Sequence, residues 1–462
     1  MNKRQKILFV GLSVLIAACA TPPQRSTLET VAPQQWHAPL PHGGNVSDLS
    51  QWWKQQGDPV LAQLVEAAQA ASPTLASARA RIDEARALRV ASGAALLPTL
   101  DAAASVSRSS AQPPQPMGTV SQAGFQSAWE IDLFGAGRAA RDAAQSRLEG
   151  ASAGWHDARV SVAAEAANLY YTQRACDGLL AIALSDAASR AETARLADLS
   201  RQAGFTAPAV AALARASAAE ANARATQQRA QCEALVKAMV ALTALPEPEL
   251  RQKMSATTAT AAETPIVIES LPAQLLSQRP DIFAAEREVA AASAEIGGAQ
   301  AQRFPRLTLS GSVGRANFRT GGTDVDLSTW SIGPLALSLP VFDGGRRVAN
   351  VEAAQARYEA ATAAYRARVR QAVREVEEAL ISLNSTAARG EDARVAVEGY
   401  RTSFEATEAR YKGGLASLVE LEEARRNRLA AENALVALER ERRSAWIALY
   451  RAAGGGWNAA QR

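Results

Sequence analysis

Two kinds of hydrophobic periodicity alternate along the chain. Segments near residues 125–133 and 307–313 place apolar residues at every second position, which is typical of β-strands with one apolar face. Segments 138–203 and 346–411 contain no proline and follow a helical pattern. At about 1.5 Å per residue, each such helix would reach roughly 100 Å. The pattern therefore predicts amphipathic strands followed by very long helices.

This pattern occurs twice. Ser72-Pro73 is matched by Arg279-Pro280 at an offset of 207, and Gly204 is matched by Gly413 at an offset of 209. An offset that drifts by single residues indicates a duplication with small loop changes. Each copy is predicted to hold a first helix, two strands and a long helix that turns back at glycine as an antiparallel hairpin. The predicted first helices span 76–97 and 284–303.

The strands of the second copy contain one irregularity. Apolar alternation continues from Trp330 and Ile332 into Leu335, but its phase slips at Gly333-Pro334. We expect a β-bulge or an edge strand there. The turn-rich stretches 113–116 and 320–323 lie between paired strands and are predicted to be external loops.

The predicted number of strands has a consequence for assembly. Four strands cannot close a barrel, and open sheet edges are not tolerated in lipid. If the strands cross a membrane, the chain must oligomerise. A dimer would supply about eight strands and a trimer about twelve, and the sequence pattern does not choose between them.

The N-terminus is predicted to be a targeting segment. Lys3, Arg4 and Lys6 precede an apolar run that extends over 7–18 and is followed directly by Cys19. The ending of two small residues and a cysteine resembles a bacterial lipoprotein signal, and an ordinary signal peptide is the alternative. We expect diacylglycerol and N-acyl lipid on Cys19 and no other cofactor.

The sequence divides into six predicted segments. The predicted segments are a signal peptide (1–18), an extended lipidated tether rich in Pro, Gln and Ser (19–59), the first repeat (60–250), a linker or equatorial segment (251–272), the second repeat (273–451) and a C-terminal tail (452–462).

Hydrophobic residues make up 48% of the chain, enough for a core, and the net charge of +4 is too small to indicate nucleic-acid binding. Three His residues with no HExxH spacing, no P-loop and no GxSxG motif predict neither a metal site nor an enzyme.

Two cysteines are placed symmetrically about the first glycine turn. Cys176 precedes Gly204 by the same number of positions by which Cys232 follows it. Equal distances from the tip of an antiparallel hairpin put two residues at the same height, and a secreted chain enters an oxidising compartment. We expect a Cys176–Cys232 disulfide, with two separate buried thiols as the alternative.

Four motifs carry a resemblance to a known family. They are the stretches 279–282, 342–346, 411–414 and 449–457, whose sequences are RPDI, FDGGR, YKGG and LYRAAGGGW. Together with the duplication, these motifs resemble the TolC-like outer membrane factor family, in particular its lipoprotein (NodT-type) branch. The resemblance implies an α+β membrane protein: four strands per chain in a trimeric 12-stranded outer membrane β-barrel, continued by an α-helical barrel of antiparallel hairpins.

The same resemblance implies functional residues near the two glycine turns. Glu420 and Glu423 occupy positions of family aspartates that ring the periplasmic mouth, and Tyr411 matches a tyrosine of the family's gating contacts. Ala416 stands where some members have a locking arginine. The turn residues expected to dock an adaptor protein are Gly204, Phe205, Gly413, Gly414 and Ser417.

The functional expectation is a passive, gated exit duct of a tripartite efflux pump that expels small molecules. The resemblance implies a homotrimer in outer membrane lipid, extending into the periplasm, with a periplasmic adaptor and an inner-membrane transporter of the RND type as partners. Export of proteins by a type I system is one alternative. A lipid-anchored periplasmic scaffold without a pore is the other, since long heptad-like helices alone would suit it.

Overall fold

The computed structural model describes residues 36–38, 52–55, 57–110, 117–256 and 276–457. The chain divides into two compact units. Of the described residues, the first unit takes those within 79–153 and 283–367, and the second takes those within 36–78, 154–282 and 368–457. The first unit contains the β-sheet, and the second contains the turns of both helical hairpins.

The predicted duplication is confirmed, because one succession of elements occurs twice. The first copy consists of α4 (Pro73–Ala94), β1 (Thr99–Ser109), β2 (Gly118–Ile131), α5 (Ala136–Gln202) and α6 (Pro208–Thr243). The second consists of α9 (Pro280–Ala301), β3 (Arg306–Thr320), β4 (Thr323–Ser338), α10 (Arg346–Lys412) and α11 (Leu418–Ala452). Helices α5 and α10 each contain 67 residues, and α6 and α11 contain 36 and 35.

The first helix of each copy begins earlier than the sequence pattern predicts. Helix α4 starts at Pro73 and α9 at Pro280, rather than at residues 76 and 284. Proline suits the first helical position, because its missing N–H would have no partner there. Among the described helices, none combines the length and the apolar character needed to cross a membrane.

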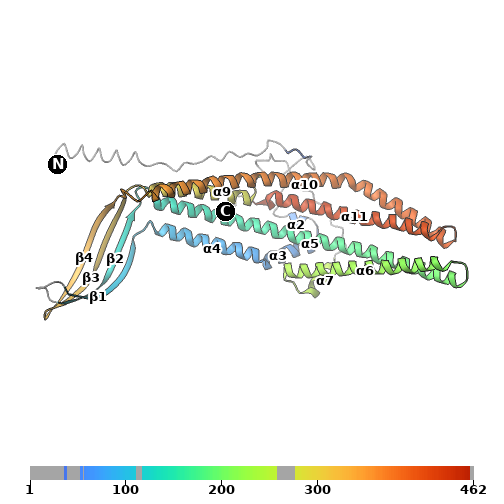
Figure 1. The fold of residues 1–462 in the computed structure, drawn as a ribbon, viewed down its shortest axis with the longest axis horizontal. Helices are drawn as coiled ribbons and strands as arrows, with labels where there is room; N and C mark the ends of the chain where they lie inside the picture. The colour runs from blue at the N-terminus through green and yellow to red at the C-terminus, as the bar shows by residue number, and fades with distance from the viewer. Residues whose placement is uncertain (1–35, 39–51, 56, 111–116, 257–275, 458–462) are drawn as a thin grey trace. The chain divides into compact units, whose positions relative to one another are not determined.

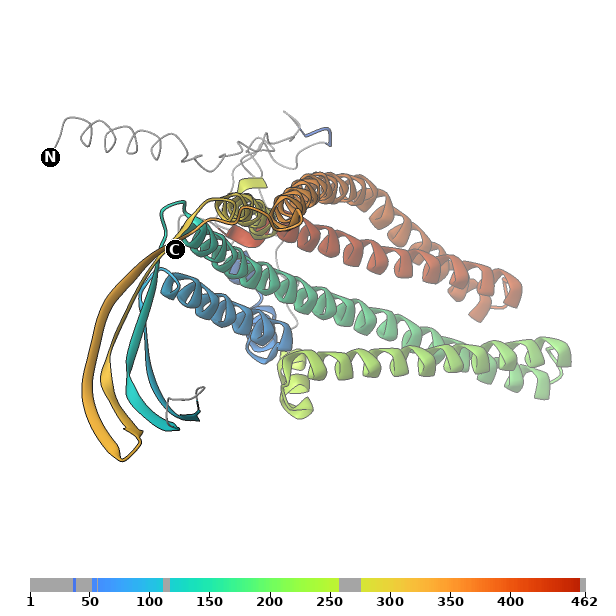
Figure 2. The ribbon, with the colours of Figure 1, turned by 60° about the vertical axis from the view of Figure 1, so that its left-hand side comes forward.

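The four strands form one antiparallel sheet in the order β1-β2-β3-β4, and they lie side by side in Figure 1. All four curve together, as Figure 2 shows. Phe125 of β2 faces Val313 of β3, which faces Trp330 of β4, so these apolar side chains share one row and one face. Their exposure in the isolated chain, between 54% and 75%, marks an apolar surface that needs a partner or lipid.

The turn and the irregularity predicted for the second copy are both present. Gly321 and Gly322 connect β3 to β4 with φ values of 56° and 86°, as a two-residue hairpin turn with two left-handed residues requires. The register shifts between Leu309 and Gly311, opposite Gly333-Pro334, which confirms the expected bulge.

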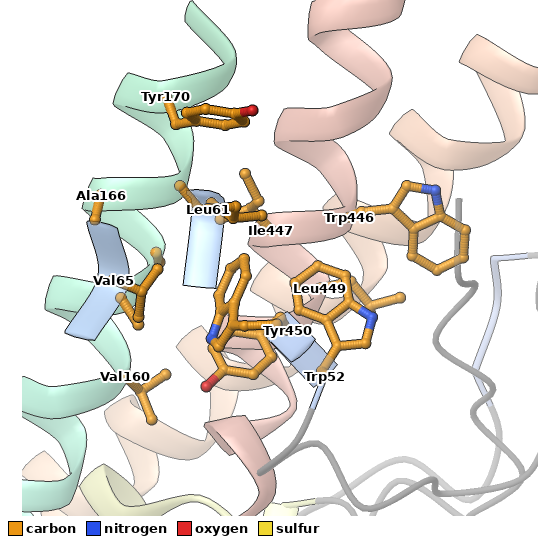
Figure 3. Packing of buried hydrophobic residues seen from close by; sticks show 14 of the residues in the cluster. Trp52, Leu61, Val65, Val160, Ala166, Tyr170, Trp446, Ile447, Leu449 and Tyr450 are labelled. Carbon is orange, nitrogen blue, oxygen red and sulfur yellow. The ribbon is translucent and has the colours of Figure 1, made fainter. Parts of the chain in front are cut away.

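The largest hydrophobic core of the second unit joins segments that are far apart in sequence (Figure 3). Leu61 and Val65 of α3 (Pro59–Ala71) pack with Tyr170 of α5 and with Ile447 and Tyr450 of α11. Trp52 of α2 (Trp52–Gln55) stacks on Tyr450 with ring centroids 5.2 Å apart. The core therefore holds the N-terminal segment and the last helix of the chain together.

One buried carboxylate organises the entry into this core. Asp58 caps α3 by accepting hydrogen bonds from the N–H groups of Val60 (3.0 Å) and Leu61 (3.2 Å). The Tyr170 hydroxyl donates to the same carboxylate, and burial of this hydroxyl raises the Tyr170 pKa. The capped helix is thus tied to α5.

Parts of the predicted tether and linker are folded, which corrects those assignments. Residues 52–55 form α2 with both tryptophans buried, and α3 begins at Pro59. The backbone N–H groups of His37 and Ala38 donate to the Glu377 carboxylate at 2.6 and 2.7 Å. Helix α7 (Glu247–Ala256) extends into the predicted linker, and the tail contains the 3-10 turn η2 (Gly454–Gly456). In the predicted tether, the burial of Trp52 and Trp53 in the core explains the departure from an extended segment.

Gly124 and Gly314 are neighbours in the register, and their lack of side chains brings two strands close. A Cβ atom on Gly124 would lie 2.5 Å from the Val313 carbonyl oxygen. We expect Gly124→Ala to destabilise the folded protein by about 1–3 kcal/mol through overpacking, measured as a lower unfolding temperature of the purified protein by tryptophan fluorescence.

The matched control is Gly118→Ala in the same strand. Its Cβ would meet Thr320 at 3.4 Å, an ordinary contact. Equal unfolding temperatures for the two variants would contradict the close-approach explanation.

Candidate functional site

Both helical hairpins turn through the same backbone motif. The N–H groups of Gly204 and Phe205 donate to the carbonyls of Arg201 and Ser200 after α5, at 3.0 and 2.9 Å. The equivalent hydrogen bonds after α10 are donated by the N–H groups of Gly414 (3.0 Å) and Leu415 (2.8 Å). This is the Schellman ending, in which a left-handed residue follows the helix. Gly204 and Gly414 have φ values of 80° and 73°.

The structure therefore corrects the pairing of the turn glycines. Gly204 corresponds to Gly414, not to Gly413, because Gly414 carries the left-handed conformation. A Cβ on Gly413 would meet the Ala409 and Arg410 carbonyls at ordinary distances of 3.5 and 3.6 Å. The motif YKGG alone does not distinguish its two glycines.

The residue after each turn glycine presents an apolar side chain to solvent. Phe205 is 87% exposed and Leu415 is 74% exposed. In a Schellman ending this position usually packs on the residue five places earlier. Those residues are Ser200 and Arg410, which offer no matching apolar surface. Both tips thus carry an exposed apolar residue on a rigid turn.

Glu420 has a structural role at the start of α11. The Ser417 side chain accepts from the Glu420 N–H at 3.2 Å, and the Glu420 carboxylate accepts from the Ser417 N–H at 2.7 Å. The Ser417 N–H, followed by its hydroxyl, holds the pKa of the Glu420 carboxyl below its usual range. Glu420 is therefore both an exposed anion and half of a capping box.

The other two residues expected at the mouth differ in exposure. Glu423 lies one turn further along α11 and is exposed. Tyr411 is partly buried against a small apolar cluster that joins the two hairpins, and burial raises its pKa. The buried members of this cluster are Ala194, Ala197, Ala211, Ala214, Phe404, Leu418 and Leu421.

Behind this cluster lies a buried ionic network that the sequence analysis missed. Arg425 of α11 is fully buried and donates to Glu422 (2.6 Å), Ser189 (3.0 Å) and Thr193 (3.1 Å). Its guanidinium carbon also lies 5.6 Å from the Phe404 ring centroid. Because Ser189 and Thr193 belong to α5, Arg425 links the second hairpin to the first.

Arg190 makes the reciprocal link from the first hairpin. It donates to Asp186 one turn earlier (2.9 and 3.0 Å), to Ser217 of α6 and to Glu422 of α11. Asp186 also lies 3.9 Å from the Nε of Arg425. The partly exposed Arg224 lies 3.6 Å from Asp186 as well, so three guanidinium groups surround the two carboxylates and each buried ion has a partner of opposite charge.

A partial signal for this network exists in the sequence. Arg190 and Ser217 lie at nearly equal distances before and after Gly204. Their spacing therefore predicts that they lie at the same height in the first hairpin and contact each other. The link from Arg190 to Glu422 joins different hairpins, and spacing within one hairpin carries no information about it. That contact follows only from the packing of the two hairpins.

Cys176 and Cys232 are bonded in the structure, with their Cα atoms 5.6 Å apart. Both are buried, and the Gln228 amide donates to the Cys176 Sγ at 3.2 Å. The predicted lipidation site, Cys19, lies outside the described residues. Among the described residues, no group of three or more His, Cys, Asp or Glu side chains could hold a metal ion.

Comparison with known proteins shows which family the chain belongs to. The sequence profile described as "Outer membrane efflux protein" matches residues 64–245 and 271–455. The chain belongs to this family. Its members are channel proteins of the outer membrane rather than enzymes, so the chain is a TolC-like efflux channel located in that membrane.

Individual relatives agree over nearly the whole length. The pyoverdine export outer membrane protein OpmQ of Pseudomonas putida is 29% identical over 99% of both chains. Nodulation protein T of Rhizobium leguminosarum bv. viciae is 28% identical over 92% of this chain and 88% of that relative. The solved outer-membrane channel OprN has a TM-score of 0.83 and 31% identity over 92% of this chain and 98% of its own.

The left-handed conformation at the second tip predicts unequal roles for its glycines. Gly414→Ala should place a Cβ at φ 73° and cost about 1 kcal/mol, which corresponds to roughly fivefold faster local opening. Hydrogen–deuterium exchange of the tip peptide measures this change. Gly413→Ala is the control, because Gly413 does not have the left-handed conformation. Equal exchange in both variants would contradict the assignment of the left-handed position to Gly414.

The position of the cysteines on one hairpin predicts a specific mapping result. Digestion without reductant should yield one linked peptide pair containing Cys176 and Cys232, and two alkylatable thiols there would overturn the bond. The loop spans 56 residues, so replacing both with serine should cost about 4 kcal/mol in the chain-entropy account. A lower urea midpoint of the helical circular dichroism signal would report this loss.

Proposed function

We propose that three copies of this chain form the exit duct of a tripartite efflux pump. Each chain supplies four strands whose apolar face is exposed, and β1 and β4 have no further strand partner among the described residues. In lipid such edges must be paired, and twelve strands leave room for a passage. A periplasmic adaptor and an RND-type inner-membrane transporter complete the pump. The likeness to a pyoverdine export protein supports a small-molecule cargo.

The N-terminus adds a lipid anchor to this assembly. We infer that Cys19 carries diacylglycerol and an N-acyl group, because it directly follows an apolar run of signal-peptide length. The acyl groups on Cys19 and the strands of the barrel would then both attach the chain to the same membrane.

The buried ionic network is the observation that supports a gate. Arg190, Glu422 and Arg425 join the α5/α6 hairpin to the α10/α11 hairpin of one chain. We propose that these contacts hold the hairpins together when the periplasmic mouth is closed, and that opening separates them. The role resembles that of the arginine lock in some relatives, whose position is taken by Ala416 here.

The exposed tips support a docking role. Phe205 and Leu415 project from rigid turns and have no apolar partner within their own motif. We propose that Gly204, Gly413, Gly414 and Ser417 shape these turns and that an adaptor covers the two apolar side chains. Glu420 and Glu423 then lie at the mouth, where three copies of each would favour cations.

The gate predicts a change in conductance when the network is broken. Arg425→Leu removes one of the two guanidinium groups that pair with the Glu422 carboxylate, and breaking a buried ion pair typically costs about 3–5 kcal/mol. Purified Arg425→Leu protein in a planar bilayer should therefore open more often and conduct more than the wild type. Wild-type conductance in a correctly inserted trimer of this variant would contradict the gate.

The acids at the mouth provide a separate control. Glu420→Gln keeps the hydrogen bonds of the capping box but removes its charge, and Glu423→Gln removes an exposed charge that takes no part in the capping box. The double variant should lose cation selectivity while its opening frequency stays close to that of the wild type. A silent bilayer for all variants, Arg425→Leu included, would contradict the proposed gate.

A further inference from the structure

The apolar face of the sheet changes character toward the β3–β4 turn. The row of Phe125, Val313 and Trp330 is apolar, and two residues closer to the turn the row contains Arg315 beside Ser328. At about 3.4 Å per residue, Arg315 lies roughly 7 Å beyond the aromatic row. Further rows toward the helices bring Ile332 and then Leu335 and Leu337 to the same face. Arg315 therefore marks the outer border of the apolar band.

Arg315 differs from the other arginine of its strand. Arg319, nearer the turn, pairs with Asp324 at 2.7 Å. Asn317 binds Asp324 (2.5 Å) and Asp326 (3.0 Å) through its amide. Arg315 is exposed and forms no ion pair with any residue in the described part of the chain. Its charge is thus available to a ligand, whereas that of Arg319 is compensated.

Two grooves flank Arg315 on this face. The first is lined by Phe125, Val313, Arg315 and Trp330, and backbone at Gly124 and Gly314 forms part of it. The second lies on the side of the turn, where Arg315 is joined by Asn317 and Asp326. Apolar surface makes up most of both grooves, Asn317 and Asp326 add polar groups to the second, and the guanidinium group of Arg315 borders both.

This arrangement fits an amphipathic anion. In the orientation proposed above, with the helices in the periplasm, the β3–β4 turn is external and the border of the apolar band lies in the outer leaflet. We propose that Arg315 binds a phosphate of lipopolysaccharide, with an acyl chain of its lipid A in the groove between Phe125 and Trp330. Guanidinium groups form strong charge-assisted hydrogen bonds with phosphate, and the aromatic side chains supply apolar contact.

The proposal concerns lipid on the outer surface and is independent of the gate. The binding of purified lipid A to the full-length detergent-solubilised channel can be titrated by native mass spectrometry. Arg315→Gln should weaken binding roughly tenfold through loss of a charged hydrogen bond, and Arg315→Lys should weaken it less. Arg319→Gln is the matched control and should stay within about twofold of the wild type.

Two further probes identify the ligand chemistry. Dephosphorylated lipid A should bind the wild type as weakly as lipid A binds Arg315→Gln. Phosphatidylglycerol should bind more weakly than lipid A, and equal binding would overturn the assignment to lipopolysaccharide. Wild-type affinity of Arg315→Gln for lipid A would overturn the site itself, while normal conductance of that variant would show that the channel is intact.

Discussion

The hydrogen-bonding requirement of a sheet in lipid is the constraint on which the rest of this molecule depends. The sheet of one chain ends at β1 and β4, and each unpaired backbone group in hydrocarbon costs several kcal/mol. In an antiparallel sheet of four, β1 and β4 run in opposite directions. The β4 edge of one copy can therefore continue the antiparallel alternation with the β1 edge of the next. Such head-to-tail pairing closes as a ring, so oligomerisation is part of the fold rather than an addition to it.

The duplication allows one chain to supply strands and helices in matched pairs. Each strand pair passes into its long helix through an aspartate: Asp132 accepts from the backbone and side chain of Arg138, and Asp343 does so from Arg347. Helices α5 and α10 contain the same number of residues, 67 each, so the two copies repeat the long helix without a change of length.

Local signals in the sequence predicted much of this architecture. The prolines, the long proline-free segments and the bulge at Gly333-Pro334 follow from backbone geometry, which each residue imposes on its own neighbourhood. Equal spacing from a turn was enough to pair Cys176 with Cys232. The buried position of Arg425 was not predictable in this way, because an Arg three residues after a Glu reads as an exposed helical pair. Burial depends on the packing of another hairpin, and no local pattern records that.

The buried ionic network lies behind the apolar cluster that joins the same two hairpins, and its ions suit the proposed gate for a physical reason. A buried ion pair contributes little net stability, because the free energy of its Coulombic attraction is offset by desolvation. When the hairpins separate, Arg190, Glu422 and Arg425 regain hydration, so the open state recovers much of what the closed contact loses. An apolar joint of the same area would gain nothing from water and would oppose opening with its whole hydrophobic free energy. The ionic joint is nevertheless selective, since only the registered hairpins bring Arg190 and Arg425 to their hydrogen-bond partners on the other hairpin. A contact that is specific when closed and hydrated when open has the properties that a reversible gate requires.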